Sequence, residues 1–363
     1  MRKILLVGGA GYVGSVLAEE LLERGFAVKI LDRLYFGDNG LREIRDRVEL
    51  IPGDMRVVSP DVLQDVDAVV NVGGLSNDPT AEYNPKANYE MNTTASVQLA
   101  EMCQDVGVRR YVFASSCSVY DRGVGNDQND FLQDETTEVD PRAAYSGSKR
   151  AAEKELLKMA GSNFCPVILR KGTIYGFSHR MRYDLVVNTF VKDALSKGYI
   201  TIHYGGEMWR PLVDVRDVAR AYIAVLRADE ELVKGKILNI SFQNMRISEL
   251  ALRVREALRD IGVDIDIRAD YGYRGVRSYR VSAEEIQRAL NFRPKVSIQE
   301  SVQNMVKQIR NYGYDDFDNP RYYNIRWMRL LEEAAQIVAV TGSVFEAPTQ
   351  EVAGERSEPA AVN

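Results

Sequence analysis

The feature that most constrains the fold is a glycine-rich segment near the start of the chain, Gly8-Gly9-Ala10-Gly11-Tyr12-Val13-Gly14. It follows a short apolar run, Lys3–Val7, and leads into a helical pattern at Tyr12–Arg24 and a second apolar run at Ala27–Leu31. A strand, a glycine turn, a helix and a second strand within about thirty residues form the order of a dinucleotide-binding βαβ unit. Glycine permits the tight turn, the approach of a diphosphate to backbone N–H groups, and close packing of helix on strand. We therefore expect Gly8, Gly11, Tyr12, Val13 and Gly14 to line a cofactor site at a helix N-terminus.

Acidic residues close the strands that come next. Asp32 ends the second expected strand, 18 residues after Gly14. A carboxylate there accepts hydrogen bonds from a ribose 2′-hydroxyl and repels a 2′-phosphate, which favours NAD over NADP, although the adjacent Arg33 weakens this preference. Asp54 and Met55 follow the expected strand Val48–Ile51. Asp54 is expected either at the adenine edge of the cofactor or as a simple turn residue.

Strand and helix patterns alternate through the first half of the chain. Further strands are expected at Ala68–Val72, Arg110–Ala114 and Val167–Arg170, and helices at Pro85–Val106 and Ala143–Ala160. This alternation predicts an α/β fold in which a doubly wound parallel sheet (Rossmann) is covered by helices on both faces. Right-handed crossovers join the strands of such a sheet.

The regular alternation of strand and helix patterns ends after about Lys171. This change predicts a smaller C-terminal substrate-binding lobe whose segments are interleaved with the sheet. Residues 1–171 and about 212–240 are assigned to the NAD-binding domain, and 172–211 with 241–318 to the lobe. Expected helices in this half are Asp184–Lys197, Asp214–Arg227, Ile247–Ile261, Ala283–Leu290 and Ile298–Ile309, with strands at Ile200–Tyr204, Ile237–Ile240 and Ile265–Arg268. Residues 319–340 contain a further amphipathic helix. The stretch 341–363, rich in Glu, Ala, Pro and Ser, has the composition of a disordered tail.

Composition excludes several classes of function. With two histidines, His179 and His203, the chain offers neither a zinc cluster nor a Ser-His-Asp triad, so no metal is expected. Three cysteines without CxxC spacing indicate a reducing compartment, hence a cytoplasmic protein. A net charge of −5 argues against nucleic acid, and no apolar run is long enough to cross a membrane.

A tyrosine and a lysine spaced four apart suggest the reacting groups. Tyr145 and Lys149 share one face of an expected helix. A phenol with a pKa near 10 is a poor base at neutral pH, but a nearby ammonium and a cationic nicotinamide lower that pKa. Ser116 follows the strand Arg110–Ala114, so its hydroxyl is expected in the ligand crevice. The neighbouring Cys117 has no histidine partner and is not expected to be a nucleophile.

Together these motifs resemble the extended short-chain dehydrogenase/reductase family, in its NAD-dependent nucleotide-sugar epimerase/dehydratase branch. The resemblance rests on the spaced glycines, Asp32, Ser116, Tyr145 and Lys149, and runs from Arg2 to about Pro294. It implies a sheet domain whose small lobe closes over a nucleotide-diphosphate sugar. It also implies a homodimer that pairs through Pro85–Val106 and Ala143–Ala160.

The resemblance also assigns further site residues. Gly73 lies in Asn71-Val72-Gly73-Gly74-Leu75, where the family runs its backbone beside the cofactor and usually has two alanines in place of Gly73-Gly74. Asn92 matches an asparagine that organises the site. Residues that the resemblance places at the substrate are Ser116, Cys117, Ser118, Thr173, Asn188, Arg210 and either Arg274 or Arg277. Asn188 and Arg210 match residues that bind the diphosphate of the sugar nucleotide.

The two residues after Ser116 narrow the reaction. The family's 4,6-dehydratases place an Asp-Glu pair where this chain has Cys117 and Ser118, which cannot serve as the required acid and base. The leading hypothesis is therefore an NAD-dependent nucleotide-sugar epimerase that acts at C4 through a keto sugar, with Tyr145 as base. One alternative is a C4 oxidase or ketoreductase of a modified nucleotide sugar. Another is a non-catalytic NAD-binding protein, against which the intact Tyr145/Lys149 pair argues.

Overall fold

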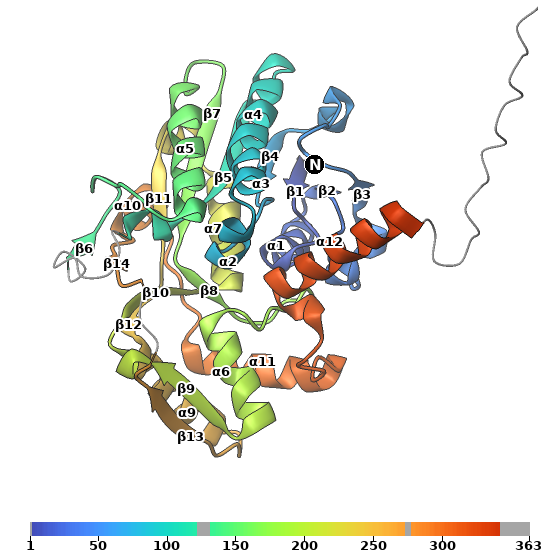
Figure 1. The fold of residues 1–363 in the computed structure, drawn as a ribbon. Coiled ribbons are helices and arrows are strands. Elements are labelled where there is room, and N and C mark those ends of the chain that lie inside the picture. Colours follow the sequence, from blue (N-terminus) through green and yellow to red (C-terminus); the bar gives the residue numbers. More distant parts are fainter. Residues whose placement is uncertain (1, 122–130, 273–276, 342–363) are drawn as a thin grey trace, which may run out of the picture.

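The computed structural model describes residues 2–121, 131–272 and 277–341, which form a sheet domain, a smaller lobe below it and a helix beside the two (Figure 1). The tail expected at 341–363 lies almost wholly outside the described residues. No helix in the described ranges is both long enough and apolar enough to span a bilayer.

The sheet domain is built on seven parallel strands, as expected from the alternating pattern. They are β1 (Lys3–Val7), β2 (Ala27–Asp32), β3 (Glu49–Pro52), β4 (Ala68–Asn71), β5 (Arg110–Ser116), β7 (Cys165–Lys171) and β11 (Ile237–Ile240). Their order in the sheet is β11-β7-β5-β4-β1-β2-β3, and every neighbouring pair is parallel. The chain runs outward from β1 to β3 and then restarts on the other side of β1 with β4. In such a sheet ligands bind beyond the carboxyl ends of the strands at this switch point.

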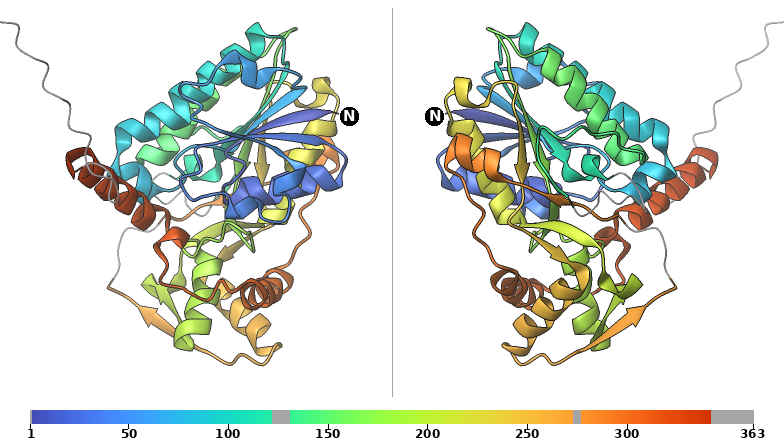
Figure 2. Two further views of the ribbon diagram at one scale, coloured as in Figure 1. Left: turned by 90° about the vertical axis from the view of Figure 1, so that its right-hand side faces the viewer. Right: turned by 90° about the vertical axis from the view of Figure 1, so that its left-hand side faces the viewer.

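Helices cover both faces of the sheet (Figure 2). One face carries α1 (Tyr12–Glu23) and α7 (Val215–Arg227), and the other carries α4 (Ala95–Asp105) and α5 (Ala144–Lys158). The single helix expected at Pro85–Val106 is wrong in detail: α3 (Pro85–Tyr89) and α4 are separated by a π-helical turn, Glu90–Thr94. Side chains of this turn bond to neighbouring segments, as when the Thr93 hydroxyl donates to the carbonyl of Ser148 at 2.8 Å. The side chains of the wider turn therefore point in directions that they would not take in a regular α-helix.

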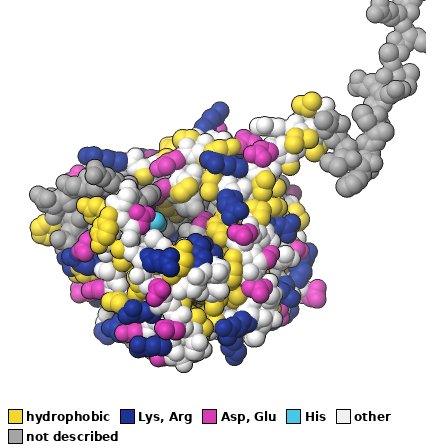
Figure 3. All heavy atoms as spheres, turned by 60° about the horizontal axis from the view of Figure 1, so that its bottom comes forward, with side chains coloured by type: hydrophobic (Ala, Val, Ile, Leu, Met, Phe, Trp, Pro, Cys, Tyr) yellow, Lys and Arg dark blue, Asp and Glu magenta, His cyan; other side chains and the backbone are white. Residues whose placement is uncertain are grey.

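The lobe has its own sheets and its own apolar core. Its strands are β8 (Thr173–Tyr175), β10 (Trp209–Asp214) and β12 (Gln243–Arg246) in one sheet, and β9 (Tyr199–His203) and β13 (Asp266–Asp270) in another. Its main helices are α6 (Val186–Lys197), α9 (Ile247–Arg259) and α11 (Ile298–Tyr312), whose apolar faces meet in a separate core. On the face that the lobe turns outward, basic and acidic side chains are interspersed (Figure 3). Further short elements are α2 (Asp78–Tyr83), α8 (Glu230–Val233), α10 (Glu284–Leu290), β6 (Leu132–Gln133) and β14 (Arg280–Val281). The domain boundaries assigned from the sequence stay a prediction.

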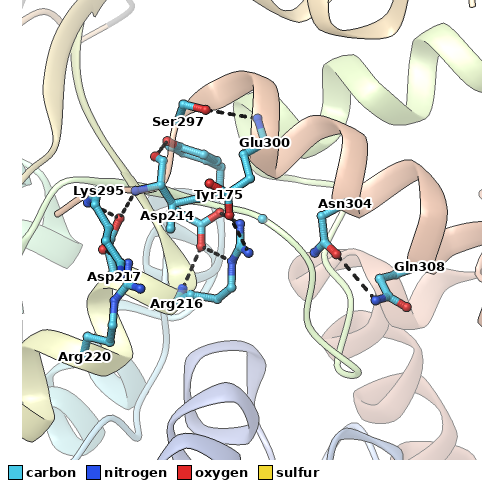
Figure 4. A network of polar contacts seen from close by, with 12 residues as sticks. Tyr175, Asp214, Arg216, Asp217, Arg220, Lys295, Ser297, Glu300, Asn304 and Gln308 are labelled. Atoms are coloured by element: carbon cyan, nitrogen blue, oxygen red, sulfur yellow. Dashed lines mark hydrogen bonds and ion pairs between the residues drawn. The ribbon is translucent and has the colours of Figure 1, made fainter. Parts of the chain in front are cut away.

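A polar network fastens the lobe to the sheet domain (Figure 4). Asp214 caps α7 by accepting from the backbone N–H of Arg216 at 2.8 Å, and it also pairs with the Arg216 side chain. Arg216 in turn reaches Glu300 of α11 at 3.0 Å. Asp217 accepts backbone N–H bonds from Lys295 and Val296, just before α11. Because Asp214 and Asp217 are fully buried, these bonds hold α11 and the residues just before it at a fixed position beside α7.

The last described helix, α12 (Asn324–Thr341), was expected at Pro320–Val340. It begins later because Pro320–Tyr322 form a separate 3-10 turn capped by Asn319. α12 lies beside α2 of the sheet domain (Figure 1), and the Tyr83 hydroxyl donates to Glu332. The side chains from Glu332 to Val340 are exposed.

Candidate active site

A cavity of about 460 Å³ lies at the carboxyl ends of β1, β2, β4, β5 and β7. Its walls come from the sheet domain, the segment after β8, and the start of α12. Sixteen residues proposed from the sequence line it: Gly8, Gly11, Tyr12, Val13, Gly14, Asp32, Arg33, Asp54, Met55, Gly73, Ser116, Ser118, Tyr145, Lys149, Thr173 and Arg277. Residues from distant parts of the chain therefore meet in one cleft at the switch point of the sheet.

The glycine loop has no room for side chains where the sequence places its first and last glycines. Gly8 has φ +78°, and a Cβ there would lie 2.6 Å from the Cα of Gly73. A Cβ on Gly14 would lie 2.1 Å from the carbonyl oxygen of Gly8. The first turn of α1 therefore packs directly against β1 and the β4 loop, and it leaves backbone N–H groups facing the cavity.

The departure at Gly73-Gly74 has a steric cause. Gly74 has φ +115°, and a Cβ on it would lie 2.0 Å from Oδ1 of Asn92. Asn92 is fully buried in the π-helical turn and donates through Nδ2 to the carbonyl of Leu75 at 2.9 Å. An alanine at position 74 would displace this amide. Asn92 therefore organises the loop from behind, and it does not line the cavity itself.

The carboxylates at the adenosine end are held in different ways. Asp32 accepts backbone N–H bonds from Ala10 at 3.0 Å and Leu34 at 2.8 Å, so it ties the glycine loop to β2. Burial raises its pKa above the ordinary value, while these bonds act in the opposite direction. Asp54 pairs with Arg33 at 2.9 Å and with Arg56 at 2.6 Å. Burial opposes its ionisation, but the two arginines outweigh burial and lower its pKa. Arg33 is thus engaged by Asp54.

Three residues expected at the reacting centre come together. Ser116 ends β5, and Tyr145 and Lys149 project from one face of α5 into the same cavity. The Ser116 hydroxyl lies beside the Tyr145 phenol, close enough to lower its pKa. Ser116 also accepts from the backbone N–H of Ser118 at 3.1 Å, which fixes its oxygen at the strand end. The Lys149 ammonium lies over the Phe113 ring, 4.8 Å from its centroid.

The expected lowering of the tyrosine pKa by Lys149 is not seen in the chain alone. Burial raises the pKa of Tyr145 to about 12, against smaller lowering effects from the Arg182 charge and the Ser116 hydroxyl. Burial also lowers the pKa of Lys149 to about 7, against a smaller raising effect of Glu153. Desolvation therefore outweighs the mutual attraction that the spacing of the two residues suggests.

Glu153, one turn beyond Lys149, belongs to a buried network rather than to Lys149. Its carboxylate accepts from Arg170 at 2.8 and 2.7 Å, from Arg150 at 3.0 Å and from the Ser115 hydroxyl at 2.5 Å. Glu153 and Arg170 are 0% and 1% exposed. The network locks α5 onto β5 and β7 and so fixes the direction in which Tyr145 and Lys149 point.

Three cations in the cavity, Lys171, Arg180 and Arg182, were not predicted from the sequence. Lys171 ends β7 and lies opposite Ser116 in the sheet register. Burial lowers its pKa well below the usual value, and the neighbouring Lys149 charge adds to this effect. Arg182 pairs with Asp184 at 2.8 and 2.9 Å. The place of Lys171 at a strand end was readable from the sequence, whereas Arg182 lies in a loop whose path the sequence does not reveal.

Four residues proposed for the site lie elsewhere. Cys117 is fully buried and donates its thiol to the carbonyl of Arg170 at 3.2 Å, and burial raises its pKa. The Asn188 side chain, also fully buried, bonds to Gly176, Arg182 and Tyr12. Its amide is thereby used within the protein, where it positions the loop after β8. Asn92 and Arg210 are likewise outside the cavity lining.

The arginines expected at a substrate diphosphate are only partly placed. Arg210 donates to the carbonyls of Trp209 and Arg277, so much of its guanidinium is occupied. Arg277 lines the cavity and pairs with Asp78 and Asp121. Arg274 lies outside the described residues. Of the two arginines that the sequence left open, Arg277 is the one for which the structure gives a position.

Comparison with known proteins identifies the family. Residues 4–241 match the model of the NAD dependent epimerase/dehydratase family. The chain belongs to this family. Among curated relatives, a putative UDP-glucose 4-epimerase of Methanocaldococcus jannaschii is 26% identical over 85% of this chain and 98% of its own length. UDP-glucuronic acid decarboxylase 1 of Arabidopsis thaliana is 27% identical over 85% and 70%. The solved structure of MoeE5 in complex with UDP-glucuronic acid and NAD has a TM-score of 0.72 at 25% identity, over 85% and 99%.

Membership of this family confirms three predictions: the Rossmann fold, an enzyme, and NAD as cofactor. The residues present suit NAD. The glycine loop is a cradle that a Cβ at Gly8 or Gly14 would fill, and Asp32 stands at the end of β2 facing the cavity. When bound, NAD would be held by the backbone of this loop and by Asp32, and its nicotinamide supplies a reversible acceptor of hydride.

Proposed function

We propose that this protein is an NAD-dependent nucleotide-sugar epimerase that acts at C4. The observation that carries the proposal is the meeting of Ser116, Tyr145 and Lys149 in a cavity that also holds the dinucleotide cradle. A relative described as a putative UDP-glucose 4-epimerase, aligned over nearly its whole length, supports the same reaction. The nucleotide-sugar substrate is part of this proposal.

Proton transfer is the part of the reaction that the chain's own residues perform. In the proposed scheme Tyr145, ionised, accepts the proton of the C4 hydroxyl, and the Ser116 hydroxyl shares the hydrogen bond as that proton leaves. Lys149 stabilises the phenolate and binds the nicotinamide ribose. A positively charged nicotinamide opposes the effect of burial on the Tyr145 pKa, which alone would keep the phenol protonated. The C4 hydrogen would leave as hydride to the acceptor that bound NAD supplies, which gives a keto sugar. The keto sugar then turns in the cavity, hydride would return to its other face, and Tyr145 returns the proton to the C4 oxygen.

The residues after Ser116 argue against 4,6-dehydration. That reaction needs an acid and a base beside the sugar. Cys117 is buried away from the cavity with a raised pKa, and Ser118 offers only a hydroxyl. Neither of the two residues that follow Ser116 therefore supplies the carboxyl group that elimination requires.

The proposal is tested by product analysis. The purified protein is incubated with a panel of nucleotide sugars, including UDP-glucose and UDP-glucuronic acid, and the products are separated and identified by mass spectrometry and NMR. We expect a product of unchanged mass with inverted C4 and no net reduction of NAD. Stoichiometric accumulation of NADH without an epimer would instead support the C4 oxidase or ketoreductase. Equal turnover by wild type and Tyr145→Phe would contradict an enzymatic role for this site.

Lys171 favours a carboxylated sugar as a second candidate. It has no ion pair with an acidic residue in the described ranges, faces the same cavity as Tyr145, and bonds only weakly to the Tyr222 hydroxyl at 3.4 Å. A hexuronate carboxylate would supply the missing negative charge. Relatives named for UDP-glucuronic acid decarboxylation are consistent with such a substrate.

With a uronate, two outcomes arise from the same first step. A ketone at C4 makes the C5 carboxylate a β-keto acid, so the bond between C5 and the carboxyl carbon can break with release of CO2. Its electron pair then forms an enolate that is protonated at C5. Product mass separates the outcomes, because epimerisation leaves the mass unchanged and decarboxylation removes CO2. Lys171→Met is expected to weaken binding of UDP-glucuronic acid more than that of UDP-glucose, and equal losses would contradict the role given to Lys171.

We further propose a cytoplasmic homodimer. α4 and α5 lie side by side on one face of the sheet domain (Figure 2), the arrangement that the family resemblance implies for pairing through two long helices. Sedimentation velocity at micromolar concentration is expected to show twice the mass of the 363-residue chain. A single monomeric species would contradict the dimer.

A further inference from the structure

Arg180 is a buried cation whose hydrogen bonds go only to neutral groups, although the charges of Asp184 and Asp32 act on it from farther away. Its side chain lines the cavity, although the residue is 6% exposed. The guanidinium donates to Oδ1 of Asn324 at 2.6 Å and to the carbonyl of Met181 at 3.3 Å, and it lies 3.6 Å from the centroid of the Phe36 ring. It forms no ion pair within the described ranges. Burial of such a charge is costly unless an anion completes the site.

The position of Arg180 in the fold indicates which anion would complete its site. Arg180 and the first turn of α1 both pack against Gly40. An ideal Cβ on Gly40 would lie 2.7 Å from the carbonyl oxygen of Ala10, 3.1 Å from the Cβ of Arg180 and 3.4 Å from the Cβ of Ser15. The Ser15 hydroxyl also bonds to that of Ser178 at 2.8 Å. Arg180 therefore lies beside the first turn of α1, where the backbone N–H groups of the glycine loop face the same cavity.

The partner of Arg180 belongs to α12. Asn324, the first residue of that helix, also donates through Nδ2 to the Ser76 hydroxyl at 3.0 Å. Farther along, the Trp327 indole donates to the carbonyl of Tyr35 at 2.5 Å. Ile325 and Met328 line the cavity itself. α12 thus forms a wall of the cofactor cleft, although it lies beyond residues 4–241, the part that the family model covers.

We propose that Arg180, oriented by Asn324, binds the diphosphate of the dinucleotide opposite the glycine loop, and that α12 closes the cleft behind it. The planar guanidinium has N–H donors left over after its bonds to Asn324 and Met181, and two phosphate oxygens match such a fork. The diphosphate then lies between the N-terminus of α1 and a cation supplied by the lobe side of the cleft. Cofactor release requires α12 to move, so NAD leaves slowly.

The diphosphate is tested with ligands that contain or lack it. The chain has two tryptophans, so in a Trp209→Phe background Trp327 alone reports binding by its fluorescence. ADP-ribose and adenosine share base and ribose, and only ADP-ribose has the diphosphate. Arg180→Gln is expected to weaken ADP-ribose binding at least tenfold and to leave adenosine binding unchanged. Arg253→Gln, an exposed arginine on α9, is the matched control and is expected to match the parent.

Several outcomes would overturn the assignment. Unchanged ADP-ribose affinity in Arg180→Gln would remove the diphosphate contact. An equal loss with adenosine would show that Arg180 supports the cleft without reading phosphate. A loss confined to NADP, with NAD unaffected, would place Arg180 at a 2′-phosphate. A circular dichroism spectrum and melting temperature equal to those of the parent are required of each variant, and Arg180→Lys, which keeps the charge, should recover part of the affinity.

The closing role of α12 is tested by the rate of cofactor release. Full-length protein loaded with NADH is mixed with excess NAD, and the loss of bound NADH fluorescence is followed with time. Asn324→Ala is expected to release NADH several times faster than wild type, because the helix loses its contacts with Ser76 and Arg180. An unchanged rate would show that α12 does not control release. Since these measurements involve no sugar, they stand whether or not the proposed epimerase reaction is correct.

Discussion

The two ends of the cleft treat buried charge in opposite ways. At the adenosine end, Asp32 is satisfied by two backbone N–H groups and Asp54 by two arginines. At the reacting end, Lys149 and Lys171 have no acidic partner in contact within the described ranges, and burial lowers the pKa of both. The two carboxylates at the adenosine end have their partners before any ligand arrives, whereas the two lysines at the reacting end do not.

This difference assigns cofactor binding to the adenosine end of the cleft and proton transfer to the reacting end. A completed site keeps its shape without ligand and contributes affinity, whereas buried groups with displaced pKa values are typical of groups that exchange protons. The carboxylate that would otherwise neutralise the reacting end, Glu153, is engaged by Arg170 and Arg150. We therefore expect changes at the reacting end to alter turnover and pH dependence, and changes at the adenosine end to alter cofactor affinity.

The largest effect is expected from Tyr145→Phe. Removing the phenol oxygen deletes the proton acceptor and the partner of Ser116, so kcat should fall by about 10²- to 10⁴-fold. The dissociation constant for NAD should change little, because the cradle is untouched. Steady-state kinetics with the substrate found by product analysis, combined with NAD titration, checks both. A variant that loses NAD affinity but keeps kcat would invert the proposed division of the cleft.

A smaller and complementary effect is expected from Asp32→Ala. The carboxylate is expected to accept hydrogen bonds from the adenosine ribose, and bonds to a charged group contribute about 1.5–3 kcal/mol. The dissociation constant for NAD should therefore rise by about tenfold or more, with kcat at saturating NAD nearly unchanged. The preference for NAD over NADP should also fall, because the repulsion of a 2′-phosphate is gone.

These changes are measured by titrating NAD and NADP against wild type and Asp32→Ala. Asp38→Ala is the control, because Asp38 is exposed and does not line the cavity. A large fall in kcat with normal NAD affinity would show that the two ends are not separable. Because Asp32 also accepts from Ala10, the melting temperature of the variant is measured in parallel.

The sequence predicted the sheet domain well because its signals are local. The glycine loop, the acidic strand ends and the spacing of Tyr145 and Lys149 depend on backbone geometry within a few residues, and the structure places all of them at one cavity. The π-helical turn at Glu90–Thr94 was missed because its pattern of apolar residues is close to that of a regular helix. What distinguishes it are contacts to Leu75 and Ser148, which no local pattern reveals.

The lobe side of the cleft was less predictable. Asn188 and Arg210 were expected to face a substrate, but the fold uses their polar groups for loop and strand contacts. Arg180, Arg182 and Asn324 reach the cavity from loops and from a helix far along the chain. Their positions depend on how the lobe is fastened by Asp214 and Asp217, a tertiary relation between segments that are distant in sequence.

A change of stability with pH tests the reacting end without any substrate. The folded-state pKa of Lys149, about 7, lies below the usual lysine value of 10.5. Between these values the unfolded chain binds more protons at this residue than the folded chain, so its contribution to the free energy of unfolding rises with pH.

Lys149→Met removes that contribution. In NAD-free protein, wild type should therefore gain stability relative to Lys149→Met by up to about 1.4 kcal/mol per pH unit as pH rises from 7 toward 10. Urea unfolding across this range measures the difference, and Lys154→Met, an exposed lysine of the same helix, should show none of it. A difference that is constant with pH would mean that Lys149 keeps an ordinary pKa, and the contrast between the two ends of the cleft would then lose its electrostatic basis.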